Sequence, residues 1–298
     1  MDGSAETWHA TCETCAEAMM NPSSGQGPDV SKSPAQRWAV LILIGAIGGL
    51  LSGLFAVGGG VIMVPLLVAL ARFDMRRAAA TSLAAIVPAA VGGSVTYLLH
   101  GEIDLVAGAF VSVGAVFGAM IGSALLKRIP LLWLRWIFIA FVVLVALRMF
   151  VVVPVRGATF PFTPAVAAAY VGLGLVVGIA SGVLGVGGGI LFVPALVALF
   201  ASSDLVAKGT SLLIMIPTSV VGTFSNWRAG TVDVRAGLVV GIAAALASIP
   251  GSALAIALPP RVSAILFGSL LLVVAGQLTA KALAASRTPR SPASPSGR

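Results

Sequence analysis

Long stretches without a charged residue alternate with short polar segments along most of this chain. The two longest are 38–71 and 157–203, and the others are 78–99, 105–126, 209–227, 236–260 and 262–280. A helix needs about 20 apolar residues to cross the hydrocarbon core of a bilayer. These stretches are rich in Gly and Ala and do not alternate as barrel strands do, and helices satisfy their own backbone hydrogen bonds in lipid. The pattern therefore predicts an all-α polytopic membrane protein.

The first stretch is too long to be one membrane span. As a single helix its 34 residues would extend about 51 Å at roughly 1.5 Å per residue, against a hydrocarbon core of about 30 Å. Three consecutive glycines at 58–60 interrupt it, so we divide it into helices at 38–57 and 61–71. We expect the other helices at 78–99, 104–126, 131–153, 164–186, 190–200, 208–227, 234–256 and 262–284.

Composition agrees with a protein surrounded by lipid. Hydrophobic residues make up 58% of the chain and charged residues 9%, whereas a soluble domain carries about 25% charged residues. The net charge of +8 lies in short loops, as membrane topology requires, so we predict no nucleic-acid partner. The triple glycine lacks the Lys-Ser/Thr of a phosphate-binding loop, and we predict no cofactor.

The second half of the chain repeats the first. Gly49–Leu70 and Gly178–Leu199 are identical at 13 of 22 positions, at an offset of 129 residues. The same offset aligns the Thr-Ser-Leu stretches at 81–83 and 210–212. Apolar bias alone does not place Gly, Pro and Ser at matching positions, so the chain is a duplication. We expect a tail at 1–36, membrane repeats at 37–155 and 156–285, and a basic tail at 286–298.

The Lys and Arg residues indicate how often each repeat crosses the membrane. Five segments per repeat place both tails on one side with 14 of these residues, and leave four on the other: Arg148, Arg156, Lys208 and Arg261. Four segments per repeat would divide them 10 to 8. The positive-inside rule favours five, with two inverted repeats and both termini cytoplasmic at the inner membrane. Charge does not distinguish short segments that cross fully from re-entrant ones.

Two glycine elbows carry the strongest functional signal. We call Ser52–Pro65 the first elbow and Ser181–Pro194 the second. Each glycine costs helix stability, about 1 kcal/mol relative to Ala, so its presence in both repeats suggests a use. Such a turn leaves backbone N–H groups free, and the short helix that follows directs its positive dipole toward them, which favours an anion. The alternative use of the glycines is close helix packing.

Hydroxyl residues at the start of the next helices extend this candidate site. They either line the same cavity or cap those same helices. Asp104 and Asp233 open their helices as caps, and the ridge formed by Gly114, Gly118 and Gly122 is for packing. The candidate substrate-binding residues are therefore Ser52, Gly58, Gly59, Gly60, Thr81, Ser82, Ser181, Gly187, Gly188, Gly189, Thr210 and Ser211.

The remaining chemistry-bearing residues form no catalytic site. His9, Cys12 and Cys15 could form part of a metal or redox site, but they lie in a polar tail without a dependable fourth ligand, and we predict no metal. His100, the other histidine, lies at a helix end and has no Ser or Cys nucleophile near it in sequence. We therefore predict that the protein is not an enzyme.

The doubled pattern G-x-x-S-G-x-x-x-V-G-G-G-x-x-x-V-P, at Gly49–Pro65 and Gly178–Pro194, resembles the sulfite exporter TauE/SafE family of membrane permeases. The Thr-Ser-Leu stretches are similar to that family as well. The resemblance covers about residues 38–284 and excludes the tail with the two cysteines. It implies transport of sulfite, sulfonates such as sulfoacetate, or related organosulfur anions in the bacterial inner membrane.

The sequence thus predicts a secondary transporter whose partners are a small anionic substrate and the lipid bilayer. One competing interpretation is a membrane-embedded enzyme or assembly factor, for which a buried catalytic cluster would be decisive. Another is a cation permease, which needs acidic or His/Cys ligands at mid-depth. The substrate, the direction of transport, the coupling ion and the oligomeric state do not follow from the sequence.

Reporter fusions test the predicted topology. Fusions after residues 35 and 286 should both report a cytoplasmic location, because the 14-to-4 division of Lys and Arg requires both tails on one side. A periplasmic signal from either fusion would exclude the inverted arrangement.

Overall fold

The computed structural model describes residues 34–125, 136, 139–140, 142–147, 163–184, 188–200 and 202–287. The chain divides by its contacts into Met1–Arg37 and Trp38–Arg298. The described residues of the first unit, 34–37, form the first turn of a helix. The packing described below is that of the second unit.

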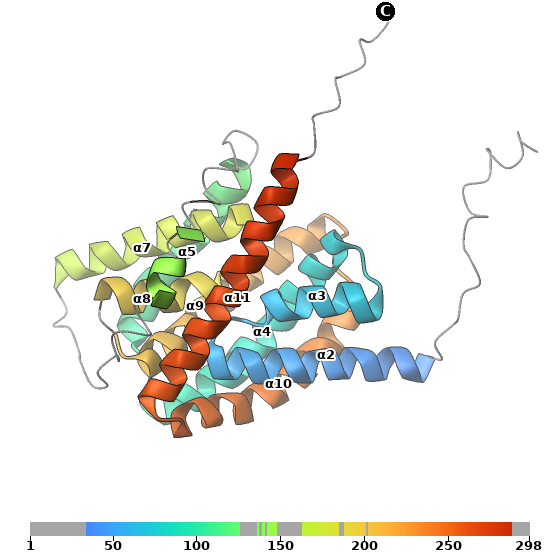
Figure 1. Cartoon of the computed structure of the whole chain (residues 1–298), viewed down its shortest axis with the longest axis horizontal. Helices are drawn as coiled ribbons and strands as arrows, with labels where there is room; N and C mark the ends of the chain where they lie inside the picture. The colour runs from blue at the N-terminus through green and yellow to red at the C-terminus, as the bar shows by residue number, and fades with distance from the viewer. Residues whose placement is uncertain are drawn as a thin grey trace, which may run out of the picture. The chain divides into compact units, whose positions relative to one another are not determined.

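The described part of the chain is helical throughout, apart from short turns, and contains no strand. This confirms the predicted fold class. Figure 1 labels the helices, whose bounds are α2 Pro34–Phe55, α3 Gly60–Ala71, α4 Met75–Leu99, α5 Leu105–Leu125, α7 Pro164–Leu184, α8 Gly189–Phe200, α9 Asp204–Arg228, α10 Val234–Ala257 and α11 Pro260–Arg287. Most of the helix predicted at 131–153 lies outside the described residues.

Both long apolar stretches are broken at their glycines, as the length argument predicts. The first helix of each pair, α2 or α7, ends before the glycines, and a short helix of 12 residues, α3 or α8, follows them. The observed helix ends lie within four residues of the predicted ones, and the largest differences are at α2 and α9, which begin four residues early at Pro34 and Asp204. The predicted helix took in Lys208 only as its first residue and left out Asp204, whereas the structure places both within α9 and buries their side chains.

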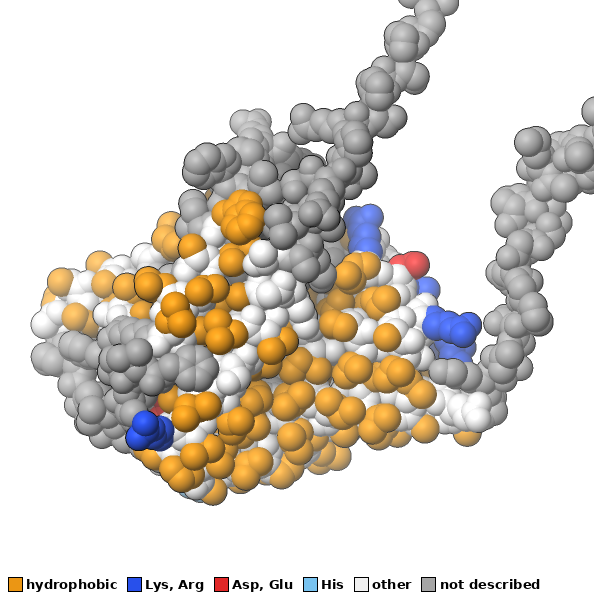
Figure 2. Space-filling view, viewed as in Figure 1, with side chains coloured by type: hydrophobic (Ala, Val, Ile, Leu, Met, Phe, Trp, Pro, Cys, Tyr) orange, Lys and Arg blue, Asp and Glu red, His pale blue; other side chains and the backbone are white. Residues whose placement is uncertain are grey.

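Six of the described helices are long and apolar enough to cross a membrane: α2, α4, α7, α9, α10 and α11. Figure 2 shows apolar side chains spread over the viewed face, with Lys and Arg side chains only near its ends. Large apolar side chains such as Leu144, Val176 and Leu246 are exposed. An apolar exterior of this extent is typical of a surface that faces lipid.

Glycines let helices of the two repeats approach each other closely. A Cβ atom on Gly45 or Gly49 of α2 would overlap the backbone carbonyl of Val240 or Ala244 in α10. The counterpart contacts join α7 to α5 and are Gly174 against Val111 and Gly178 against Ala115. The two sets of contacts are equivalent, because each residue of one set lies 129 residues from its counterpart in the other. The ridge of α5 is used for packing as predicted, with Gly114 and Gly118 against carbonyls of α7.

Two threonines join the repeats in the same reciprocal way. The Thr81 hydroxyl accepts a hydrogen bond from the Asp233 backbone N–H at 3.2 Å, and the Thr210 hydroxyl accepts one from the Asp104 backbone N–H at 3.0 Å. Each aspartate in turn caps its own helix through its carboxylate, as predicted. A contact that recurs with its two partners exchanged is typical of an interface with two-fold symmetry. The duplicated halves therefore pack on each other through equivalent surfaces.

Removing one of these hydroxyls should weaken the junction between the repeats. Thr81→Val or Thr210→Val keeps the side-chain shape but leaves a partly buried N–H without its acceptor, which costs about 0.5–1.5 kcal/mol. Each variant should therefore unfold at a lower temperature in detergent than the parent protein. Thr279→Val is the matched control, because the Thr279 hydroxyl bonds only within its own helix at 2.7 Å. Equal melting of all three variants would contradict the role of the threonines.

Candidate functional site

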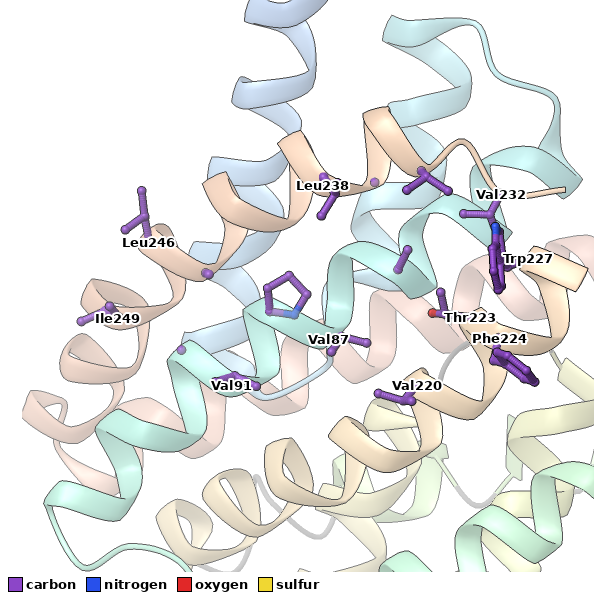
Figure 3. Close-up of a pocket in the computed structure, with 16 residues that line it drawn as sticks. Val87, Val91, Val220, Thr223, Phe224, Trp227, Val232, Leu238, Leu246 and Ile249 are labelled. Carbon is purple, nitrogen blue, oxygen red and sulfur yellow. The ribbon is translucent and has the colours of Figure 1, made fainter. Parts of the chain in front are cut away.

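A groove of about 920 Å³ lies between α4, α9 and α10. Figure 3 shows Val87, Val91, Leu238 and other apolar side chains along it, with Thr223 at one end. A small anion needs hydrogen-bond donors or positive charge, and this lining supplies hardly any. Apolar side chains at a lipid-facing surface suit acyl chains instead. The glycine elbows, rather than this groove, are therefore the candidate anion site.

The first elbow makes a tight buried turn between α2 and α3. Gly58 and Gly59 have φ angles of 76° and 66°, in the left-handed region that glycine adopts without strain. The Gly60 N–H donates to the Gly58 carbonyl at 2.7 Å, and the Met63 N–H donates to the Gly59 carbonyl at 2.6 Å. Gly59 thereby becomes the N-cap of α3, and the positive end of this helix points into the turn.

Several backbone donors of this turn have no acceptor. In the described part of the chain, no oxygen accepts a hydrogen bond from the N–H groups of Val57, Gly58, Gly59 or Val61. Three of these residues are buried: Val57, Gly58 and Gly59. Nearly all buried N–H groups in proteins are paired, because leaving one unpaired costs as much as a lost hydrogen bond. Such a cluster of free donors at a helix N-terminus suits an anion.

A side-chain hydroxyl adds to this set. Ser52 lies one turn before Ala56 in α2, and its side chain is only 1% exposed. Its Oγ atom has no hydrogen-bond partner. The Ser52 carbonyl accepts from the Ala56 N–H at 2.7 Å, which places this residue directly against the turn. The first elbow therefore holds an unused hydroxyl as well as unused amides.

The second elbow repeats part of this geometry. Gly188 has a φ angle of 77°, and its carbonyl accepts from the N–H groups of Leu191 and Phe192 at 2.9 and 3.2 Å. A Cβ atom on Gly188 would lie 3.0 Å from the Ser181 hydroxyl oxygen. Serine and glycine thus lie side by side in the second elbow. Gly187 lies outside the described residues.

The fold brings the two elbows into contact. A Cβ atom on Gly189 would lie 2.7 Å from the carbonyl carbon and oxygen of Val57, so the backbones of the two elbows touch. The Met215 side chain of α9 lies between Gly58 and Gly189. It would overlap a Cβ atom on Gly58, and its sulfur would lie 2.6 Å from a Cβ atom on Gly189. The Ser211 hydroxyl, one turn earlier in α9, donates to the Ala56 carbonyl at 3.3 Å. We call this meeting point the elbow junction.

Comparison with known proteins identifies the group to which this architecture belongs. Residues 15–149 and 170–297 match the family described as sulfite exporter TauE/SafE. The chain belongs to this family. It is thus a multi-pass membrane protein from a family of membrane transporters. No solved structure matches it.

Individual relatives carry names of the same kind. The chain is 27% identical over 219 residues to the probable membrane transporter protein YunE of Bacillus subtilis strain 168, covering 66% of this chain and 80% of that protein. It is 27% identical over 203 residues to YdhB of the same organism, covering 65% and 80%. A shorter match, 37% over 92 residues and about a third of each chain, is to the probable membrane transporter protein MJ0441 of Methanocaldococcus jannaschii.

For this member of the TauE/SafE family, the structure places the predicted site residues in two groups. Ser52, Gly58, Gly59, Gly60, Gly188, Gly189, Ser181 and Ser211 lie at or beside the two elbows. The hydroxyls of Thr81 and Thr210 instead accept hydrogen bonds from the backbone of the opposite repeat, so they do not cap their own helices, one of the two uses predicted for them. The Ser82 hydroxyl donates to the Ala79 carbonyl of its own helix at 2.9 Å.

Two features of this region were not found from the sequence. Met215 is one apolar residue within an apolar helix, and nothing in its spacing distinguishes it. The buried pair of Asp204 and Lys208 was not predicted, because the predicted helix began only at Lys208 and left out Asp204. The described residues contain no group of three metal ligands, and His9, Cys12 and Cys15 lie outside them.

The unused Ser52 hydroxyl predicts an uncommon stability effect. Ser52→Ala removes a buried polar group that has no partner, so the variant should unfold at the same or a higher temperature in anion-free detergent. Ser252→Ala is the control, because the Ser252 hydroxyl is equally buried but donates to the Ser248 carbonyl at 2.9 Å. Clear destabilisation by Ser52→Ala alone would show that the hydroxyl has a partner in the empty protein.

Proposed function

We propose that the protein is a secondary transporter of the inner membrane for a small oxyanion, and that the elbow junction is its binding site. The observation that carries the proposal is the cluster of unused donors in the first elbow. An anion with several acceptor oxygens would satisfy these backbone N–H groups and the Ser52 hydroxyl together. The dipole of α3 adds to the attraction.

Sulfite or a sulfonate is the substrate class that we propose. Both present three oxygens on one sulfur atom, which suits a site with several converging donors. The family's description as sulfite exporters supports the same class. The absence of Lys and Arg from both elbows fits a site that holds its anion by dipoles and releases it again.

Met215 is the side chain that must move for the anion to enter. It fills the space between Gly58 and Gly189, and its unbranched thioether adopts new rotamers at little cost. We infer that the structure represents an occluded arrangement, in which the Met215 side chain closes the elbow junction. Movement of one repeat against the other would then expose the junction to alternate sides, as in other transporters with inverted repeats.

Substitution of the elbow glycines tests the proposed site. Gly59→Ala adds a Cβ atom 2.7 Å from Met63 Cε at a left-handed φ, and should lower sulfite transport in proteoliposomes at least tenfold without loss of membrane insertion. Gly230→Ala is the matched control. Gly230 has nearly the same φ, 68°, but a Cβ atom there would meet nothing within 4 Å.

The two glycine variants separate site geometry from backbone strain. If both variants transport sulfite at the rate of the parent protein, the glycines of the elbow have a packing role alone. An equal loss in both would attribute the defect to strain at a positive φ rather than to the site.

Ser52→Ala should weaken binding while it leaves the empty protein intact. The loss of one hydrogen bond costs about 0.5–1.5 kcal/mol, so the Kd for sulfite should rise about two- to tenfold. Isothermal titration of purified protein measures this change, with Ser252→Ala as the control. An unchanged Kd would remove the hydroxyl from the site.

A further inference from the structure

A buried ion pair lies at the start of α9. The side chains of Asp204 and Lys208 are 0% and 1% exposed, and Lys208 Nζ lies 3.8 Å from Asp204 Oδ2. Lys208 Nζ also donates a hydrogen bond to Ser263 Oγ of α11 at 2.5 Å. The ammonium group lies 5.7 Å from the centre of the Phe267 ring. Ser263, the Phe267 ring and the Asp204 carboxylate are thus described partners of the buried ammonium group.

The fold does not require this pair. At the equivalent positions of the first repeat, the offset of 129 residues finds Met75 and Ala79, and α4 forms there without any ion pair. Buried ion pairs contribute little net stability, because desolvation offsets most of their attraction. Ionisable residues inside membrane segments commonly mark substrate or proton pathways. A pair that is present in only one of two equivalent halves therefore suggests a functional use.

The pair lies beside the elbow junction. Ser211, less than one turn beyond Lys208 in α9, donates to the Ala56 carbonyl of the first elbow. The Phe267 ring that faces Lys208 also contacts Phe55, the last residue of α2, with 6.3 Å between ring centres. One aromatic pair thus separates the buried cation from the proposed anion site.

Among the described residues, the other charged or titratable groups near the pair are Tyr97, Glu102, Asp104 and Arg261. Tyr97 of α4 packs against Gly209, donates its hydroxyl proton to the Gly53 carbonyl at 3.0 Å, and lies within electrostatic reach of Asp204 and Glu102. Asp104 is engaged as the cap of α5. Arg261 of α11 is exposed, and α8 is wholly apolar in sequence. Asp204 is the carboxylate that the described residues place against the lysine, at 3.8 Å.

We propose that Asp204 and Lys208 couple movement of the anion to movement of a proton. The proton binds the Asp204 carboxylate, which becomes a neutral acid, and Lys208 keeps its positive charge. The anion then takes the place of the carboxylate as the counter-ion of Lys208 on its way to or from the elbow junction. One proton and one monoanion cross together with no net charge. The inference rests on the proposed function, since it names the coupling ion of that transport.

Thermodynamic linkage makes the coupling reciprocal. A proton on Asp204 strengthens binding of the anion near Lys208, and the anion strengthens binding of the proton by the same factor. A pH gradient should therefore drive sulfite accumulation in proteoliposomes. At one proton per monoanion, the accumulation approaches about tenfold for each pH unit of the gradient.

The decisive variant is Asp204→Asn, which holds a neutral side chain beside Lys208. It should lose accumulation driven by the pH gradient, and its sulfite exchange should no longer depend on pH. Asp74→Asn is the matched control, because Asp74 is an exposed carboxylate at the start of α4, the repeat counterpart of α9. It should accumulate sulfite as the parent protein does. At a given pH the parent protein and both variants are exposed to the same ratio of sulfite to bisulfite. A difference in accumulation between them therefore does not arise from protonation of the substrate.

A double variant distinguishes loss of coupling from loss of folding. Asp204→Leu combined with Lys208→Met replaces the pair by apolar side chains, a change that buried ion pairs commonly tolerate. The double variant should insert and melt like the parent protein but lose gradient-driven accumulation. Lys208→Met alone leaves a buried carboxylate without its counter-ion and should melt at a lower temperature.

The outcomes separate the coupling proposal from the transport proposal. If the parent protein moves no sulfite or sulfonate at all, the proposed function fails. If the parent protein moves sulfite but ignores the pH gradient, or Asp204→Asn still accumulates it, only the coupling proposal is overturned.

Discussion

The structure depends on one constraint: a backbone that breaks its helix inside a membrane must find partners for the N–H groups it frees. Water is absent from the bilayer core, so each unpaired group costs several kcal/mol there. The first elbow nevertheless leaves the N–H groups of Val57, Gly58, Gly59 and Val61 without an acceptor in the described part of the chain. Backbone that remains unsatisfied in this way is ready for a ligand, and the sign of its dipoles selects an anion.

The duplicated fold holds this turn in place. Glycine contacts join α2 to α10 and α7 to α5, and the hydroxyls of Thr81 and Thr210 join the repeats reciprocally. These contacts bring Gly189 of one elbow against Val57 of the other. The two halves depart from equivalence at Asp204 and Lys208, beside the junction. Symmetric contacts thus build the proposed site, and an asymmetric ion pair supplies the proposed coupling.

Local features were predictable from the sequence, and contacts between distant segments were not. Triple glycines ended α2 and α7 where the length argument placed the breaks, and Asp104 and Asp233 capped their helices, because both effects act within a few residues. Thr81 accepts a hydrogen bond from Asp233, 152 residues away, which no local pattern reveals. The predicted helix left out Asp204 and began only at Lys208, because periodicity cannot distinguish a charge that tertiary contacts bury from one that water surrounds.

Hydrogen–deuterium exchange at the first elbow tests the central claim most directly, since the claim concerns backbone amides. Exchange of peptides that cover residues 56–62 should be measured in detergent with and without sulfite, with peptides around Gly101 and Gly230 as internal references. Binding at the elbow junction predicts slower exchange there at saturating sulfite, and no change around Gly101 or Gly230. Sulfite binding that leaves exchange at the first elbow unaltered would contradict the account and place the anion site elsewhere.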